Sequence, residues 1–258
     1  MKKMMLVTML LVASGAAWAA EGKLGADVDL TWASKTLWRG MDTGDNKAAF
    51  TPSVNFDLWG SGFRAGMAAW WNGADTNGAE AALPTEKYVY MLSYANSFNK
   101  GDKAQVDYNL TYNYHDYYAH SSSAWDYQDL ALTLSLPKIT DCLVPRYTYA
   151  YTWSGRPGPT PGALGQAFSG PAGFYHIFGV DYNFKLADQP MTFSADATYN
   201  DGTFGADHDW SHITWGLRTA FKVGSGQFIP GIYYQTSMDD SVNKNDEFYT
   251  ALSYRFSF

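Results

Sequence analysis

The sequence has little of what most disulfide-stapled or soluble folds depend on. It contains one cysteine, Cys142, in 258 residues, which excludes an intramolecular disulfide and a cysteine-cluster metal site. Charged residues make up 17 % of the chain, against about 25 % in typical soluble domains. Beyond residue 20, no apolar run reaches the roughly 20 residues that a bilayer-spanning helix needs. These shortages disfavour a secreted disulfide scaffold and a helical membrane protein.

The N-terminus has the order of a targeting segment. Lys2 and Lys3 precede an apolar run from Met4 to Val12, and small residues lead to Ala-Trp-Ala at positions 17–19. This order predicts a signal peptide at residues 1–20 and one domain at residues 21–258. A membrane anchor is the alternative, but the run is short for a spanning helix. Removing residues 1–20 takes away two lysines and no acid, so the formal net charge changes from −7 to −9, which argues against a nucleic-acid partner.

Polar and apolar residues alternate along most of the remaining chain. In QVDYNLTYNYHDY (105–117), and again in TFSADATYN (192–200), every second residue is apolar or aromatic. A period of two predicts β-strands. The predicted strands lie near residues 27–38, 50–59, 62–71, 86–97, 104–116, 126–136, 143–153, 174–184, 191–200, 211–222, 227–237 and 247–258.

A soluble antiparallel sandwich would show the same alternation, so strand length, connections and aromatic placement must decide. Most predicted strands run about 9 to 13 residues, the length of tilted membrane-spanning strands, whereas soluble strands average about 5 to 6. Long connections alternate with short turns, as in outer-membrane barrels. Aromatic residues gather at both strand ends, as interfacial girdles do. We expect Trp38, Trp70, Trp71, Tyr117, Trp153 and Trp210 in the long-loop girdle, and Trp59, Phe98, Phe184, Phe221 and Phe258 in the short-turn girdle.

The predicted fold class is therefore all-β, a closed antiparallel transmembrane β-barrel of about twelve strands. Lipid offers no hydrogen-bond partner to an edge strand, so the last strand must pair with the first, near Val28, Leu30 and Trp32. The aromatic terminal strand ending in Phe258 also resembles the C-terminal assembly signal of bacterial outer-membrane barrels. That resemblance implies recognition by the barrel-assembly machinery.

Parity along the strands assigns a polar set of side chains to the interior. Twelve strands give a backbone radius of about 12 Å and an opening of about 5 to 6 Å radius. Two interpretations stay open: a water-filled lumen, and a filled polar interior held by Asp–Arg pairs that does not conduct. Because acids outnumber arginines, we expect cations and small neutral solutes to be favoured. The candidate pore-lining residues are Asp29, Asp57, Arg64, Asp107, His115, Asp129, Arg146, Asp181, Asp196, Arg218, Glu247 and Arg255.

Catalytic and metal-binding patterns are weak. His176 faces outward by parity, where outer-membrane phospholipases carry a His-x-Ser pair, but Phe178 stands at the serine position. His208 and His212 are four residues apart, a spacing that chelates metals on a helix, whereas in a barrel loop it indicates a solvated acidic segment. We therefore predict no catalytic residue, no metal site and no cofactor.

Residues 34–71 resemble the N-terminal hairpin of the TorF-type porin family. In that family an aromatic-Arg-Gly turn leads through a short acidic loop to a strand and a Ser-Gly-Phe turn; here AAF (48–50) replaces the expected proline and glutamine. The resemblance implies a small outer-membrane barrel. Read from the residues alone, Gly40 supplies a positive φ where the strand bends, and Arg39 either reaches lipid headgroups or has a role in a pore. The matching residues are Trp38, Arg39, Gly40, Asp42, Ser61, Gly62, Phe63 and Gly66.

The predicted function is passive diffusion of small hydrophilic solutes or ions across a bacterial outer membrane, without enzymatic activity. The alternative is a non-conducting barrel whose long loops adhere or bind a ligand at the cell surface. Outer-membrane lipid and lipopolysaccharide are the expected partners, and the oligomeric state is open. Residues 154–173, rich in Gly and Pro, are predicted to form a long extracellular loop, with an inward-folded constriction as an open possibility.

Overall fold

The computed structural model describes residues 24–44, 46–73, 86–118, 126–155 and 172–258. The predicted signal peptide and most of the 154–173 loop lie outside these residues. The described chain is built almost wholly of strands. These are β1 (Leu24–Ala33), β2 (Leu37–Trp38), β3 (Met41–Asp42), β4 (Ala49–Leu58), β5 (Phe63–Asn72), β6 (Glu86–Phe98), β7 (Val106–Asp116), β8 (Tyr127–Ser135), β9 (Leu143–Ser154), β10 (Gly173–Leu186), β11 (Gln189–Asp201), β12 (His208–Thr219), β13 (Phe221–Val223), β14 (Gly226–Ser237) and β15 (Glu247–Ser257), with a 3₁₀ turn, η2 (Thr203–Gly205).

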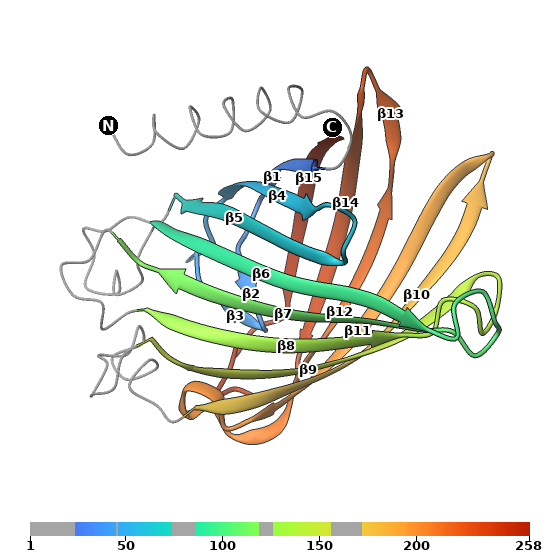
Figure 1. The fold of residues 1–258 in the computed structure, drawn as a ribbon. Coiled ribbons are helices and arrows are strands. Elements are labelled where there is room, and N and C mark those ends of the chain that lie inside the picture. The colour runs from blue at the N-terminus through green and yellow to red at the C-terminus, as the bar shows by residue number, and fades with distance from the viewer. Residues whose placement is uncertain (1–23, 45, 74–85, 119–125, 156–171) are drawn as a thin grey trace.

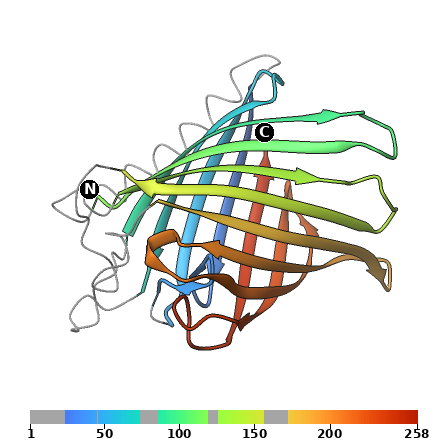
Figure 2. The same ribbon diagram turned by 90° about the horizontal axis from the view of Figure 1, so that it is seen from below.

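The strands close into one antiparallel barrel (Figures 1 and 2). Each strand of the wall pairs with the next wall strand along the chain. β13 continues β12 along the same partner, β14, so these two count as one and the barrel has twelve strands. β1 closes the ring against β15, with Val28 opposite Phe256 and Leu30 opposite Tyr254. The last residue is held too, because Phe258 N donates to Ala26 O at 2.9 Å. The predicted pairing of the two terminal strands is confirmed.

The two ends of the barrel differ in their connections (Figure 1). At one end the strands are joined by short turns, such as Ala187–Asp188 between β10 and β11, where both residues have positive φ. At the other end, longer connections follow β1, β5, β7, β9, β11 and β14. We call the corresponding halves of the interior the turn half and the loop half. Within the described ranges, no helix is long and apolar enough to cross a membrane.

The outer face of the wall is apolar and exposed. Leu92 on β6, Ile232 on β14 and Phe248 on β15 each keep half or more of their surface exposed. Trp59, Phe98, Phe221 and Phe258 are exposed at the turn end, where the sequence predicts aromatics. A soluble fold would bury such residues in a core. The described core is instead inside the ring, where polar and aromatic residues such as Tyr127, Thr152, Tyr175 and Gln235 are fully buried.

The first strand departs from the prediction. The alternation predicts a strand as far as Trp38, but β1 ends at Ala33 and the chain leaves the wall. Residues 34–44, which we call the inner hairpin, carry the short β2–β3 pair inside the barrel (Figures 1 and 2). Their turn needs positive φ at Arg39 (48°) and Gly40 (91°), which a continuing strand does not accommodate. The expected positive φ of Gly40 is confirmed. Of the two roles left open for Arg39, the reach to lipid headgroups is wrong, because its side chain enters the lumen.

Candidate functional site in the lumen

Trp38 lies among aromatic side chains in the loop half of the lumen. Its ring centroid is 5.3 Å from that of Tyr127 on β8 and 6.2 Å from that of Tyr175 on β10. Phe204, in η2, is 5.7 Å away. Each aromatic pair at such separations contributes about 0.5–1.5 kcal/mol beyond burial. The indole therefore anchors the inner hairpin to strands across the ring from β1.

Arg39 extends the same contact to the far wall. Its Nη1 donates to Thr152 Oγ1 on β9 at 2.5 Å, and its Nη2 lies 3.5 Å from Asp129 Oδ1 on β8. Its guanidinium carbon sits 4.7 Å and 4.4 Å from the ring centroids of Trp38 and Tyr175. A planar guanidinium can stack on rings while donating from its edge. The side chain is only 13 % exposed, so the carboxylate of Asp129 offsets the cost of burying its charge.

Lys87, on β6, is buried in a second cationic position beside the hairpin. Its Nζ donates to Tyr127 Oη at 3.1 Å. The rings of Trp38, Trp70, Tyr117 and Tyr127 surround the ammonium at 5.2–5.8 Å from their centroids. Ring faces attract a cation electrostatically, more strongly where water is excluded.

Asp129 links Arg39 to a histidine. Its Oδ2 lies 2.7 Å from His115 Nε2, and its Oδ1 accepts from Asn113 Nδ2 at 2.9 Å. His115 stacks on Tyr127 with ring centroids 3.9 Å apart. Asp129 and His115 are both almost fully buried. Two predicted pore-lining residues thus meet in one packed network, and their partner Arg39 comes from the hairpin.

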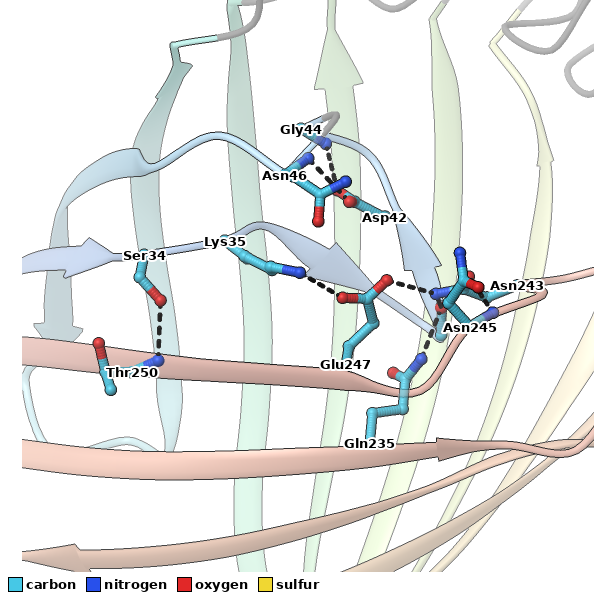
Figure 3. A network of polar contacts seen from close by, with 11 residues as sticks. Ser34, Lys35, Asp42, Gly44, Asn46, Gln235, Asn243, Asn245, Glu247 and Thr250 are labelled. Carbon is cyan, nitrogen blue, oxygen red and sulfur yellow. Dashed lines mark hydrogen bonds and ion pairs between the residues drawn. The ribbon is translucent and has the colours of Figure 1, made fainter.

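A second set of contacts holds the other side of the inner hairpin (Figure 3). Gln235 Nε2 on β14 donates to Gly40 O at 2.8 Å, and Asn243 Nδ2 donates to the same oxygen at 3.3 Å. Lys35 Nζ forms an ion pair with Glu247 Oε2 on β15 at 2.5 Å. Gly40 also packs so closely on His212 that an added Cβ would overlap the imidazole. The hairpin is therefore fixed at both sides of the ring.

The turn half of the lumen holds charges in a different setting. On one wall Arg146 bridges Asp181 and Asp196 at 3.2 and 2.8 Å, and Arg218 lies 3.7 Å from Asp181. On the wall that includes the closing strands, Arg255 pairs with Asp29 at 2.9 Å and Arg64 with Asp27 at 3.2 Å. The Arg64 and Arg255 side chains are 46 % and 53 % exposed. The Arg64–Asp27 and Arg255–Asp29 pairs are therefore wet ion pairs, each of which contributes about 0–1 kcal/mol, whereas Arg146 is 30 % exposed and its two aspartates are 19 % and 24 % exposed.

A cavity of about 720 Å³ lies against the second of these walls. A second one, of about 480 Å³, lies near the turns. Asp107, in this second cavity, accepts from Ser97 Oγ at 2.7 Å and from Gln105 Nε2 at 2.6 Å. Asp57 accepts from Gly60 N in the β4–β5 turn. The larger cavity is lined by Asp27, Asp29, Thr31, Thr51, Ser53, Asn55, Arg64, Ala68, Met91, Ser253 and Arg255.

The predicted site residues thus fall into separate groups. His115, Asp129 and Glu247 contact the inner hairpin, while most of the others form the ion pairs of the turn half. Asp57 and Asp107 instead bind groups at the turns. Whether they line a conducting pore stays a prediction.

The aromatic girdle at the loop end is smaller than predicted. Trp38, Trp70 and Tyr117 are not interfacial, because all three surround Lys87 inside the lumen. Trp71, Trp153 and Trp210 do lie with outer-face aromatics, such as Phe50 beside Trp71. Parity would have assigned Trp70 and Tyr117 to the interior, since Trp70 shares the parity of the inward Arg64 and Tyr117 that of the inward His115.

The histidines whose spacing suggested metal binding or catalysis lie in different environments. His208 is exposed and lies 2.6 Å from Asp201 Oδ1, while His212 is buried beside Ser211. His176 Nδ1 lies 2.8 Å from Tyr147 Oη among outer-face tyrosines. No group of three or more metal-ligating side chains converges anywhere in the part of the chain that the structure describes.

Solved outer-membrane porins have a similar architecture. The KdgM porin aligns with 90 % of this chain and 99 % of its own, at 12 % identity and a TM-score of 0.54. The NanC porin aligns with 89 % of this chain and 98 % of its own, at 13 % identity and a TM-score of 0.56. An outer-membrane channel from Pseudomonas putida F1 covers 92 % and 96 %, at 9 % identity and a TM-score of 0.51.

This chain has a porin-like barrel fold. The likeness confirms the predicted fold class, a closed antiparallel barrel of twelve strands. No protein-family model matches the sequence, and no curated protein matches it.

Proposed function

We propose that this protein is a channel of the bacterial outer membrane through which small hydrophilic solutes or ions diffuse down their gradients, without enzymatic activity. The loop end would face the cell exterior and the turn end the periplasm, as is usual for such barrels. The names of the similar structures, two porins and an outer-membrane channel, support this proposal.

One observation carries the proposal: a polar, solvent-accessible interior inside an apolar outer wall. The 720 Å³ cavity is lined mainly by charged, hydroxyl and amide side chains. The arginines that face it remain about half exposed although they lie inside the ring. A barrel that served only as a stable support would be expected to fill this space with packed side chains, as eight-stranded barrels do.

The charges of the turn half favour cations weakly. Four arginines, Arg64, Arg146, Arg218 and Arg255, lie among six carboxylates there. Rings of carboxylates select for cations, but most of these are paired with arginine. We therefore propose a modest preference for cations and neutral solutes. The six carboxylates are Asp27, Asp29, Asp57, Asp107, Asp181 and Asp196.

A second candidate is a non-conducting barrel that binds a ligand through its loops. The tight packing of the inner hairpin in the loop half favours it, because that layer buries side chains from many strands. Planar bilayers separate the two candidates. The mature chain, residues 21–258, should give steps of stable size, and a salt gradient should give a small reversal potential of cation-selective sign. A correctly folded, inserted barrel that stays silent, even after the hairpin is loosened, would contradict the channel.

The proposed setting also includes partners. The apolar outer face would contact outer-membrane lipid and lipopolysaccharide, and the strand ending in Phe258 would present its aromatic terminus to the barrel-assembly machinery. We further propose a relationship to the TorF-type porin family. The aromatic-Arg-Gly motif of that family is matched here by Trp38, Arg39 and Gly40, which form the turn of the inner hairpin. Deleting Phe258 should lower the amount of assembled barrel in cells without changing the fold of protein refolded in detergent.

A further inference from the structure

We propose that the inner hairpin, residues 34–44, sets the size limit of this channel, and that Arg39 is the positioning residue that holds it in the lumen. The inference rests on the proposed function, because a size limit has meaning only for a barrel that conducts. It assigns the constriction to the first loop-end connection, between β1 and β4.

The first argument is how burial changes along the barrel axis. In the loop half, inward side chains from nearly every strand between β6 and β15 are almost fully buried. On the turn half the inward arginines of β5 and β15 are about half exposed. One strand shows both states, since on β9 Ala150 and Thr152 are buried while Thr148, nearer the turns, is not. The narrowest layer therefore coincides with the hairpin.

The second argument is that the hairpin cannot hold its own position. β2 and β3 are two residues each and form only two residue pairs. Isolated hairpins of even greater length are marginally stable in water. Contacts with the barrel wall must therefore hold the hairpin in the lumen.

Arg39 makes the polar contacts that join the hairpin to the wall opposite β1. It joins the hairpin to Thr152, 113 residues away in sequence, and to Asp129 and Tyr175 on two further strands. Losing the arginine would leave the Asp129 carboxylate buried with one cation fewer, which favours water entry. On the other side, Gly40 is held by Gln235 and Lys35 by Glu247. Without Arg39 the hairpin would therefore loosen but stay in the lumen.

The test compares Arg39→Ala with Arg39→Lys and with Lys138→Ala. Lys138 is exposed in the turn between β8 and β9 and controls for the loss of one positive charge. Lysine at position 39 keeps the charge but cannot donate to Thr152 and Asp129 in the same forked geometry. Each mature protein is reconstituted, and single-channel conductance and the permeability of liposomes to neutral sugars of increasing size are measured.

Arg39→Ala should raise conductance by about twofold or more and admit larger sugars, because the hairpin obstructs a lumen whose width limits flow. Arg39→Lys should fall between Arg39→Ala and the native protein, and Lys138→Ala should match the native protein. A silent native protein beside a conducting Arg39→Ala would also support the hairpin as the obstruction.

A second readout guards against a simple folding defect. In a Cys142→Ser background, Ala150→Cys places a thiol in the buried layer. Its reaction with a charged thiol reagent should be about tenfold faster when Arg39 is also alanine, because local opening follows the lost contacts. Native-like conductance and an unchanged size limit in a folded Arg39→Ala protein would overturn this inference and leave the channel intact. Silence of all variants would instead count against the proposed function.

Discussion

The two halves of the lumen carry similar side chains under different conditions. In the loop half, Arg39 and Asp129 are 13 % and 4 % exposed and are enclosed by aromatic rings. In the turn half, Arg255 and Asp29 are 53 % and 18 % exposed and border a cavity. Both are arginine–aspartate pairs between distant parts of the chain, yet only the first has been removed from water.

This difference decides what each pair can do. A dry ion pair is costly to form but strongly destabilising to break, because the remaining charge has no solvent. A wet pair contributes little and is screened by salt, but its charges remain available to passing ions. The loop half is therefore suited to holding a fixed geometry, and the turn half to influencing solutes in transit.

Removing the Trp38 indole should cause the largest loss of stability. Trp38→Ala deletes a partly buried ring that contacts Tyr127, Tyr175 and Phe204, and truncating a large aromatic side chain in such packing costs up to about 3–5 kcal/mol. Urea unfolding in detergent micelles measures it. The matched control is Trp59→Ala, whose side chain is 67 % exposed at the turn end and should cost less than about 0.5 kcal/mol. Equal losses in the two variants would mean that the loop half is not packed as described.

A charge-to-amide exchange compares the two halves directly. Asp129→Asn leaves Arg39 buried without its carboxylate and should cost about 3–5 kcal/mol. Asp29→Asn leaves an exposed Arg255 that water can solvate and should cost about 0–1 kcal/mol. Unfolding midpoints of the two variants, measured side by side, give the comparison. A costly Asp29→Asn would show that the turn half is drier than the structure indicates.

A methyl group at Gly40 should have an intermediate effect. Its φ of 91° and its contact with His212 both oppose a Cβ, so Gly40→Ala should cost about 1–3 kcal/mol. Gly60→Ala is the control, because its φ of 64° is also positive but no atom lies within 4 Å of an added Cβ. It should cost about 1 kcal/mol. If the two losses are equal, the hairpin does not press on His212.

Selectivity should respond least. Asp107→Asn removes a carboxylate from the cavity near the turns and should lower the cation preference slightly. Raising the salt from about 0.1 M to 1 M shortens the screening length from about 10 Å to 3 Å, which should shrink the native preference as well. Reversal potentials at the two concentrations measure both effects. A preference that does not depend on salt would place its origin in the buried layer instead.

The strands of the wall were predictable because their pattern is set by residues adjacent in sequence. A period of two specifies strands, parity specifies faces, and lipid demands closure, so the pairing of the last strand with the first, near Val28, followed without any long-range information. Parity also assigned Asp29, Arg146 and Arg255 to the interior, where each forms an ion pair.

The inner hairpin was not predictable, because its position depends on contacts between distant residues. Nothing near Trp38, Arg39 and Gly40 in the sequence marks Thr152 or Gln235 as a partner of the hairpin. The expectation that aromatics at strand ends mark the membrane interface was also wrong for Trp70. Its ring instead faces the buried ammonium of Lys87. Lys87 lies on the inward parity of β6, and a lysine there was the available signal for an occupied lumen.

The most direct test of the account is a ladder of single cysteines along the inward face of β9, in a Cys142→Ser background. Val144, Thr148, Ala150 and Thr152 run from the turn end to the loop end, and only the last two are buried. The account predicts fast reaction of a charged thiol reagent at positions 144 and 148 and an abrupt loss of reactivity at 150 and 152. Uniform reactivity along the ladder, or protection at all four positions, would contradict a lumen that is wet in one half and closed by the inner hairpin in the other.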